Sequence, residues 1–489
     1  MAGDDGGAGG KRAVGIANGG IGILSLTGLD ANDGSWQWTG SSRARYASLS
    51  TSSAPFPRPL ILLHTASSSS CHRAHRRADG SCSVRPRPSP HRSSPNSLSF
   101  SSLTFLGTSS GGGPSPTRNC SSLVASVCSN GSLWMVDCAE GTLRQFHNQP
   151  VTYDNAQHLK VARVNKIFIT HMHADHVMGI ITFLRNVLYP VPLPTALSQH
   201  HPKPDPSVEI YGPAGIRNFV RLNMKMTLSR SNDKYVVHEL LTPEDTVTPC
   251  TTDDLHSSEA PGRDIVSEDG FWPEITKGPG FYGDVCVDAG PIAHRDPCLG
   301  FIFRESVSPY RKIVILGDTY DPTALVPLIN QFSSSPTSLL VHESTDAHID
   351  STIDIKAKRS KEAVSSTALA RGHSTPDLAG AFARIIDAQK LVLNHIGSRF
   401  PAASGGGFRA NVIREIERQA SVAWGKGTAR AAWDYMRVVV PAPEAEEEEQ
   451  PYGSGSGPTW NHHSDVQHAD AIYFRRPQNY NPRKRYARS

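Results

Sequence analysis

The sequence contains no apolar run that could cross a membrane. A spanning helix needs about 18 or more consecutive apolar residues, and the stretch "LILL" at residues 60–63 is far too short. Cysteine is also sparse, with eight residues in the chain. These cysteines include no C-x-x-C pair, and Cys138 stands among residues expected to form a core strand. We therefore expect a soluble protein with free thiols in a reducing compartment, rather than a disulfide framework.

Hydrophobic residues make up only 38% of the chain, against roughly 45–50% in a typical globular protein. The deficit is concentrated in residues 1–100, where Ser, Arg, Gly, Ala and Pro dominate. This composition predicts a disordered low-complexity extension. Residues 40–100 contain a single acid, Asp79, and so also resemble a transit peptide, but Asp4 and Asp5 favour the simpler interpretation.

The other end of the chain, residues 441–489, is predicted to be a flexible tail that is first acidic and then basic. It contains "EAEEEE" at 444–449, and residues 471–489 carry six basic groups and no acid. A solvated tail is the simplest interpretation, although such a segment can also attract phosphates or act as a nuclear-import signal. The formal net charge of +4 is too small to indicate nucleic-acid binding by itself. The compartment stays open between cytoplasm, nucleus and mitochondrion.

Between residues 101 and 440, short β-rich runs alternate with amphipathic stretches. Helices are expected at 179–189 and 376–390, where apolar residues recur with a period near 3.6. Strands are expected at 102–106, 121–127, 132–137, 166–170, 312–318, 338–344 and 390–395. Strands followed by helices predict a layered α/β domain.

The segment "NKIFITHMHADHVMGI" at 165–180 concentrates metal-capable side chains where a predicted strand ends. In an extended segment residues i and i+2 point the same way, so His171 and His173 would face one point. A helix starting near Asp175 and His176 would aim that pair at a second point close by. One HxHxDH segment can therefore serve two metal ions, and zinc favours such nitrogen and carboxylate ligands.

Further metal-capable residues follow other strand-like runs. His294, Asp318 and His395 each come just after such a run, and His373 comes just before a predicted helix. Each is a weak signal alone, because a loop histidine is more often a surface residue than a ligand. The carboxyl ends of strands form the edge of a sheet where α/β folds place their ligand sites, so we expect these residues to meet there.

Several motifs in a fixed order resemble the metallo-β-lactamase superfamily, and within it the short form of ribonuclease Z. The resemblance covers roughly 101–440. It rests on "LTFLGTSSGGGPSPTRNCSSLV", "WMVDCAEGTLRQF", HxHxDH, "YGPAGIRNFV", "ILGDTYDP", "LVHESTD", "RGHSTPDLAGAFA" and "LVLNHIGSRF". It implies an αββα sandwich, as a metallo-β-lactamase-fold hydrolase domain, and a zinc-dependent endoribonuclease that removes the 3′ trailer from precursor tRNA and leaves a 3′-hydroxyl.

The resemblance also implies roles for single residues, with two Zn²⁺ per subunit. One zinc would be held by His171, His173 and His294, the other by Asp175, His176 and His395, and Asp318 would bridge them. Asp175 would also assist the attacking water, and His373 would protonate the leaving group. Glu343 would orient one of these histidines from outside the ligand set. The implied partner is precursor tRNA, with no membrane, and the implied assembly is a homodimer.

Some features depart from the family pattern. Ala139 replaces a glycine and Thr117 a lysine, and only a short stretch separates His294 from Asp318, where the family inserts an RNA-clamping arm. The extra length lies at 248–283 instead, and its acidic character does not suit phosphate binding. One alternative is therefore another hydrolase of this fold, a phosphodiesterase or arylsulfatase of small molecules. A second is an RNA-binding relative without metals, which the complete ligand set argues against.

Overall fold

The computed structural model describes the backbone of residues 12–17 and 20–25 and, in full, residues 101–150, 158–189, 206–231, 233–308, 310–332, 335–402 and 407–440. The chain divides into two compact units, residues 1–91 and 92–489. In the first unit, β1 (Arg12–Ala17) and β2 (Gly20–Ser25) pair as an antiparallel hairpin. The rest of the expected N-terminal extension and the expected tail at 441–489 lie outside the described residues, so both remain predictions.

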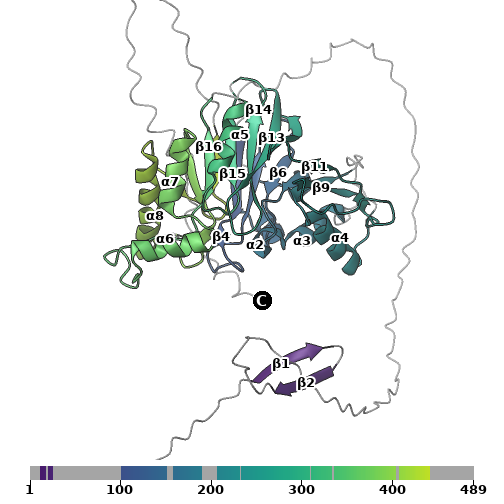
Figure 1. The fold of residues 1–489 in the computed structure, drawn as a ribbon, viewed down its shortest axis with the longest axis horizontal. Coiled ribbons are helices and arrows are strands. Elements are labelled where there is room, and N and C mark those ends of the chain that lie inside the picture. The colour runs from purple at the N-terminus through teal and green to yellow at the C-terminus, as the bar shows by residue number, and fades with distance from the viewer. Residues whose placement is uncertain are drawn as a thin grey trace, which may run out of the picture. The chain divides into compact units, whose positions relative to one another are not determined.

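Two β-sheets form the centre of the second unit (Figure 1). In the first sheet, β6 to β9 run parallel, and β3, β5 and β20 continue it in antiparallel fashion. Its strands, in spatial order, are β10 (Glu259–Ala260), β9 (Tyr235–Leu241), β8 (Val208–Pro213), β7 (Val164–Phe168), β6 (Leu133–Val136), β5 (Ser122–Ser126), β3 (Ser101–Gly107) and β20 (Arg437–Val440), and β11 (Asp264–Val266) also pairs with β9.

The second sheet is antiparallel in its first half and parallel in its second. Its strands, in spatial order, are β12 (Trp272–Pro279), β13 (Asp284–Ile292), β14 (Cys298–Glu305), β15 (Lys312–Leu316), β16 (Leu339–Glu343), β17 (Leu391–Asn394) and β19 (Arg430–Ala431). Because β13 and β15 are both antiparallel to β14, they run in the same direction as β16 and β17. The carboxyl ends of β13, β15, β16 and β17 therefore lie at one edge.

The hydrophobic core lies between the two sheets and continues beneath helices on both outer faces. Phe168 of the first sheet lies 5.3 Å, between ring centroids, from Phe303 of the second. The first sheet is covered by α1 (Thr142–His147), α3 (Ile180–Leu188) and α4 (Ile216–Met226), and the second by α5 (Val326–Gln331), α7 (Pro376–Ile385) and α8 (Phe408–Trp424). This is the predicted αββα sandwich, and the fold class is confirmed.

The remaining elements are short or lie at the rim. They are α2 (Ala174–Val177), α6 (Lys361–Ala370), the 3₁₀ turns Val161–Arg163 and Thr323–Leu325, and the parallel pair of β4 (Ser109–Ser110) with β18 (Ile396–Gly397). The β4–β18 pair joins a loop of the first sheet to a loop of the second. None of the described helices is long and apolar enough to span a membrane, and the six cysteines in the described ranges are free thiols.

Each predicted strand and helix between 101 and 440 is present, but some ends differ. The strand expected at 166–170 ends at Phe168, because the backbone N–H of Thr170 donates to the Asp137 carboxylate and leaves the ladder. The helix expected at 376–390 ends at Ile385. Two residues later Asp387 has a φ of 51°, in the left-handed region, which turns the chain toward β17.

Part of the acidic segment 248–283 folds against the free edge of the first sheet, and its strand β12 forms the edge of the second sheet. Its strands β10 and β11 run parallel to β9. Glu259 forms an ion pair with Arg221, at 2.8 Å, and Asp264 one with the buried Arg217, at 2.7 Å. Part of the acidic character thus neutralises arginines of α4.

Candidate metal centre

The HxHxDH segment forms the loop from β7 into α2. His171 is completely buried, and its Nε2 lies 2.9 Å from Nδ1 of His173. The two rings face one point, as the spacing predicts. Asp175 and His176 occupy the first turn of α2 and face a neighbouring point. The strand ends three residues before His171, so the two histidines stand on an extended loop rather than at the end of the strand.

The first group of donor atoms comes from His171, His173, His294 and Asp318, and all lie within 4.8 Å of one another. His294 follows β13 and Asp318 follows β15, so the common direction of these strands brings both to one edge. The Nδ1 of His294 lies 2.6 Å from the carbonyl oxygen of Gly372. A carbonyl only accepts, so Nδ1 carries the proton and Nε2 is bare. That Nε2 is buried and has no hydrogen-bond partner in the described structure.

The second group consists of Asp175, His176 and His395. The Nε2 of His395 lies 3.3 Å from Nε2 of His176 and 3.3 Å from Oδ2 of Asp175. His395 follows β17 with a φ of 51°. This left-handed conformation is costly for a residue with a side chain, and it turns the ring into the site.

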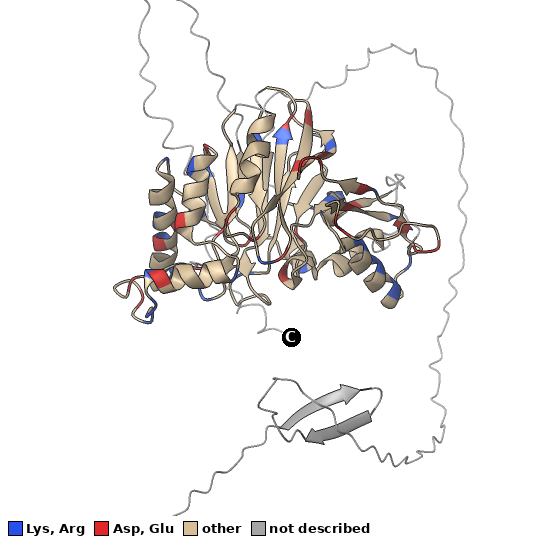
Figure 2. Ribbon diagram, in the orientation of Figure 1, with Lys and Arg blue, Asp and Glu red and all other residues tan. Residues whose placement is uncertain are grey.

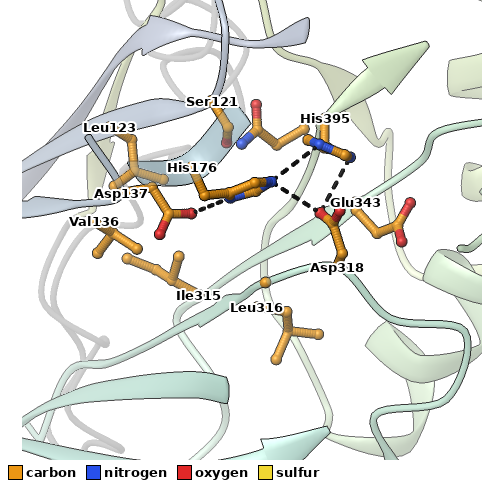
Figure 3. Close-up of a pocket in the computed structure, with 12 residues that line it drawn as sticks. Ser121, Leu123, Val136, Asp137, His176, Ile315, Leu316, Asp318, Glu343 and His395 are labelled. Atoms are coloured by element: carbon orange, nitrogen blue, oxygen red, sulfur yellow. Dashed lines mark hydrogen bonds and ion pairs between the residues drawn. The ribbon is translucent and has the colours of Figure 1, made fainter. Parts of the chain in front are cut away.

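Asp318 belongs to the first group and also lies beside His176 and His395 of the second group (Figure 3). Its Oδ2 is 3.6 Å from Nε2 of His171, and its Oδ1 is 3.6 Å from Nε2 of His176. Each carboxylate oxygen therefore faces a different group. Asp318, His176, His395 and Glu343 also line a small cavity of about 10 Å³.

The site is built to present bare nitrogen and oxygen atoms. His176 donates from Nδ1 to Oδ2 of Asp137 at 2.7 Å, and His173 from Nε2 to Oδ2 of Asp296 at 2.8 Å. In both rings, as in His294, the outer nitrogen is held by an acceptor and the inner one points into the site. Metal-binding histidines show this arrangement, because the outer hydrogen bond fixes the ring and its tautomer.

The spacing of the donors also suits zinc. Zinc–nitrogen and zinc–oxygen bonds of about 2.0–2.1 Å place the ligand atoms of a tetrahedral site about 3.3 Å apart. The contacts of His395 with His176 and Asp175 have this length, and those of Asp318 with the two groups are slightly longer. The residues therefore fit two metal ions with Asp318 between them.

Electrostatics favour the metal-binding form of several ligands. Burial lowers the pKa of His171 well below its usual value and also lowers that of His294, so both rings are neutral at pH 7. Burial alone would raise the pKa of Asp318, but the charges of His395, His176 and His171 hold it well below its usual range. Burial would lower the pKa of His176, but the Asp137 and Asp318 carboxylates raise it, so a metal must compete with a proton there.

His373 and Glu343 lie at the rim of the second sheet's half of the site. His373 precedes α7 by three residues, and its Nδ1 donates to Oε1 of Glu343 at 3.0 Å. Burial lowers the pKa of His373, but the Glu343 carboxylate outweighs this and raises it. Donor atoms of His373, Asp318 and His395 also lie within 4.8 Å of one another. The geometry alone therefore allows His373 to be a proton donor or a ligand.

All the predicted site residues thus meet at one place, while several residues that support them were not predicted. Thr345 contacts Oε2 of Glu343 at 2.6 Å and Nδ1 of His395 at 3.0 Å. Asp137 orients His176 and binds Thr170. Asp137 stands in the "DCAEGT" motif and Thr345 in "HEST". Motif membership was the available signal, but it assigns no contact.

A glycine-rich loop completes the site from the first sheet. The backbone N–H of Gly111 donates to Oδ2 of Asp175 at 2.9 Å. Behind this loop the half-buried Asp434 accepts hydrogen bonds from the backbone of Asn119, from Thr108 and from Gln145, at 2.7, 2.9 and 3.0 Å. This contact set was also not predicted, since Asp434 lies far along the chain from the loop.

The chain is similar in sequence to proteins of known family. Residues 101–195 match a family described as the anti-Pycsar protein Apyc1. The zinc phosphodiesterase ELAC protein 1 of Bos taurus is 29% identical over 400 residues, covering 69% of this chain and 98% of that protein. The ribonuclease Z of Streptococcus thermophilus is 31% identical over 343 residues, covering 64% of this chain and 98% of that protein. The crystal structure of human tRNase Z, short form, is similar with 28% identity and a TM-score of 0.46, covering 70% of this chain and 99% of that one.

Proposed function

Because this chain belongs to the ribonuclease Z family and is therefore a hydrolytic nuclease, we propose that it removes the 3′ trailer from precursor tRNA by hydrolysing one phosphodiester bond. The products are a tRNA with a 3′-hydroxyl and a trailer with a 5′-phosphate. The observation that carries the proposal is the position of Asp318, whose two oxygens face two separate groups of bare donor atoms.

The two groups support a metal site with two zinc ions. His171, His173 and His294 would hold one ion, Asp175, His176 and His395 would hold the other, and Asp318 would contribute to both. Zinc bound there would lower the pKa of a water molecule toward 7 and draw charge from the phosphoryl oxygens. Asp175 is ionised, and its carboxylate is positioned by Gly111 and His395. It accepts the proton of the attacking water.

His373 acts on the other side of the reaction. When the bond between phosphorus and the 3′ oxygen breaks, that oxygen leaves as an alkoxide and needs a proton. Glu343 holds Nδ1 of His373, so only Nε2 is free to donate. The carboxylate also favours the protonated ring, and solvent restores the proton after each turnover.

A second candidate function is hydrolysis of small phosphodiesters. It is favoured by the connection between His294 and Asp318, which contains only β14, β15 and the turn between them. No long arm for gripping RNA is inserted there. The sequence relationship to ribonuclease Z favours the first proposal. We also propose that the chain forms a homodimer, in which the second subunit supplies a further RNA-binding surface. Sedimentation would test this assembly.

The test is cleavage of a 3′-extended precursor tRNA beside bis(p-nitrophenyl) phosphate, with zinc measured in the same preparation. We expect a cut just after the discriminator base and about two zinc ions per chain. Hydrolysis of the small ester while the tRNA stays intact would replace the proposal with the second candidate.

His171→Ala tests the ligand assignment. It should abolish both activities and lower the zinc content, with the melting temperature little changed because the loop lies at the rim of the sheets. His147→Ala, an exposed histidine of α1, is the matched control and should change neither activity. Retained turnover in His171→Ala would contradict the assignment.

A further inference from the structure

A second cavity, of about 260 Å³, lies apart from the metal ligands. Its walls come from the segment that follows β16, including Ala347 and Ile349, and from the segment that follows β18, including Arg399 and Phe400. The start of α8 closes it with Phe408 and Val412. Ligand pockets in proteins measure about 300–1,000 Å³, so this one has room for roughly one nucleotide unit.

The lining is strongly basic. It contains Lys356, Lys358, Arg359, Arg399 and Arg409, and a single acid, Asp354. Lys and Arg of this region are visible in the loop before α6 (Figure 2). Outside the cavity wall, Asp346 binds Arg359 at 2.8 Å and also pairs with Arg399. One carboxylate thus serves two guanidinium groups, and the cavity keeps a positive charge.

Three of these basic side chains are free to bind a ligand. Lys356, Lys358 and Arg409 are exposed, and none has a side-chain ion pair or hydrogen bond with another described residue. A cluster of unpaired like charges is unfavourable unless an anion binds there.

Apolar side chains provide the rest of the lining. Ile349, Val412 and the buried Phe400 form apolar wall, while Phe408 is 51% exposed although it is aromatic. An exposed ring beside cationic groups is the arrangement that single-stranded nucleic acid uses, because a base stacks on the ring while lysines bind the backbone.

The cavity also lies within reach of the metal centre. Ala347 comes two residues after Thr345, so the Cα atoms of these two residues are at most about 7 Å apart. Thr345 in turn contacts His395. Arg399 comes four residues after His395, at most about 14 Å away. Val364 of the wall belongs to α6, and this helix leads into Gly372 and His373. The cavity is therefore joined by short chain segments to Thr345, which contacts Nδ1 of His373 at 3.4 Å and Nδ1 of His395 at 3.0 Å.

We propose that this cavity binds a nucleotide of the RNA strand on the 5′ side of the scissile bond, at the end of the mature tRNA. The inference rests on the proposed function, in which His373 protonates the 3′ oxygen of that strand. Lys356 and Lys358 bind a phosphate, and Phe408 stacks on a base. The cavity thereby contributes part of the RNA-binding surface for which the short His294–Asp318 connection has no room.

The test compares wild type with the double variant Lys356→Ala/Lys358→Ala on precursor tRNA. The KM should rise roughly tenfold with a smaller change in kcat, and the slope of log(kcat/KM) against log salt should become shallower by about two. A role in folding alone would not alter the salt slope. The control is Lys277→Ala/Lys426→Ala, which removes the same charge from exposed lysines outside the cavity.

Trailer length identifies the strand. If the cavity binds the tRNA side of the scissile bond, the tenfold rise in KM of the double lysine variant should persist when the trailer is shortened from ten nucleotides to one. Phe408→Ala should then weaken the binding of both the long-trailer and the short-trailer precursor. An effect that vanishes with the one-nucleotide trailer would overturn the assignment, as would equal changes in the control variant. If wild type itself leaves the precursor uncut, it is the proposed function that fails, and the comparison of variants is not reached.

Discussion

The histidines of the metal centre divide their two nitrogens between different tasks. His173, His176 and His294 each donate a proton outward, to Asp296, Asp137 and Gly372 respectively, and direct the other nitrogen inward. The inward direction of His173 and His176 could be predicted from sequence, because the HxHxDH spacing places these side chains on the same side of the loop. The outward acceptors could not, because Asp296 and Gly372 meet these rings only through the folding of distant segments.

The role of His373 can be tested at the same scale, because the two substrates differ in their leaving groups. A ribose 3′ alkoxide needs a proton, whereas p-nitrophenolate is stable and departs without one. His373→Ala should therefore slow RNA cleavage by roughly 10²–10⁴-fold, and hydrolysis of bis(p-nitrophenyl) phosphate by much less.

Metal content decides between the two roles that the geometry allows. As a proton donor, His373 can be removed with zinc content unchanged. Equal losses on both substrates together with a loss of zinc would instead make His373 a ligand, alongside Asp318 and His395.

At the scale of elements, apolar runs were sufficient to predict seven strands, but not β8, β9, β13 or β14, and the ends of the predicted elements depended on side-chain contacts. The end of β7 is set by the contact of Thr170 with Asp137, and the end of α7 by the left-handed Asp387. The segment 248–283 was recognised as acidic, but its position could not be predicted. The position of its strands β10 and β11 is set by two arginines of α4, because Arg217 binds Asp264 and Arg221 binds Glu259.

The position of the glycine-rich loop depends on a single half-buried acid, Asp434. Asp434 ties the loop that carries Gly111 to α1 through Thr108, Asn119 and Gln145. Burial raises the pKa of Asp434 to about 6, although hydrogen bonds from Asn119 and Thr108 oppose the shift. The folded pKa is therefore above the usual value of 3.8. The ionised form is disfavoured by folding, and stability falls as pH rises from about 4 through 6.

Asp434→Asn removes this titration. Relative to the variant, wild type should lose on the order of 3 kcal/mol of unfolding free energy between pH 4 and pH 7. Denaturant unfolding of both proteins at several pH values measures the difference, in which all other titrating groups cancel. Parallel curves would show that Asp434 titrates normally in the fold.

At the scale of the whole molecule, β20 is the last described strand and pairs with β3, the first strand of the sandwich. It buries Val438 and Val440, and the carbonyl of Val440 accepts a hydrogen bond from Arg311 at 3.1 Å. Two buried valines contribute about 1.5–3 kcal/mol each, which is a large share of a total stability of about 5–15 kcal/mol.

Truncation tests the limits of the domain. A chain of residues 92–440 should melt within about 2 °C of the full chain, while residues 92–436, which lack β20, should melt about 10 °C lower or fail to fold. A large fall for 92–440 would show that the segments beyond these limits belong to the folded domain.

The pairing of β3 with β20 also sets the order in which the enzyme is completed during synthesis. The ribosome releases β3 early, and its edge stays open until Val440 emerges. By then His171 and His173 have long since left the ribosome, but His395 has emerged only shortly before. A nascent or prematurely ended chain therefore carries an unfinished sheet and lacks part of the proposed ligand set. Nuclease activity arises only once nearly the whole sandwich has been made.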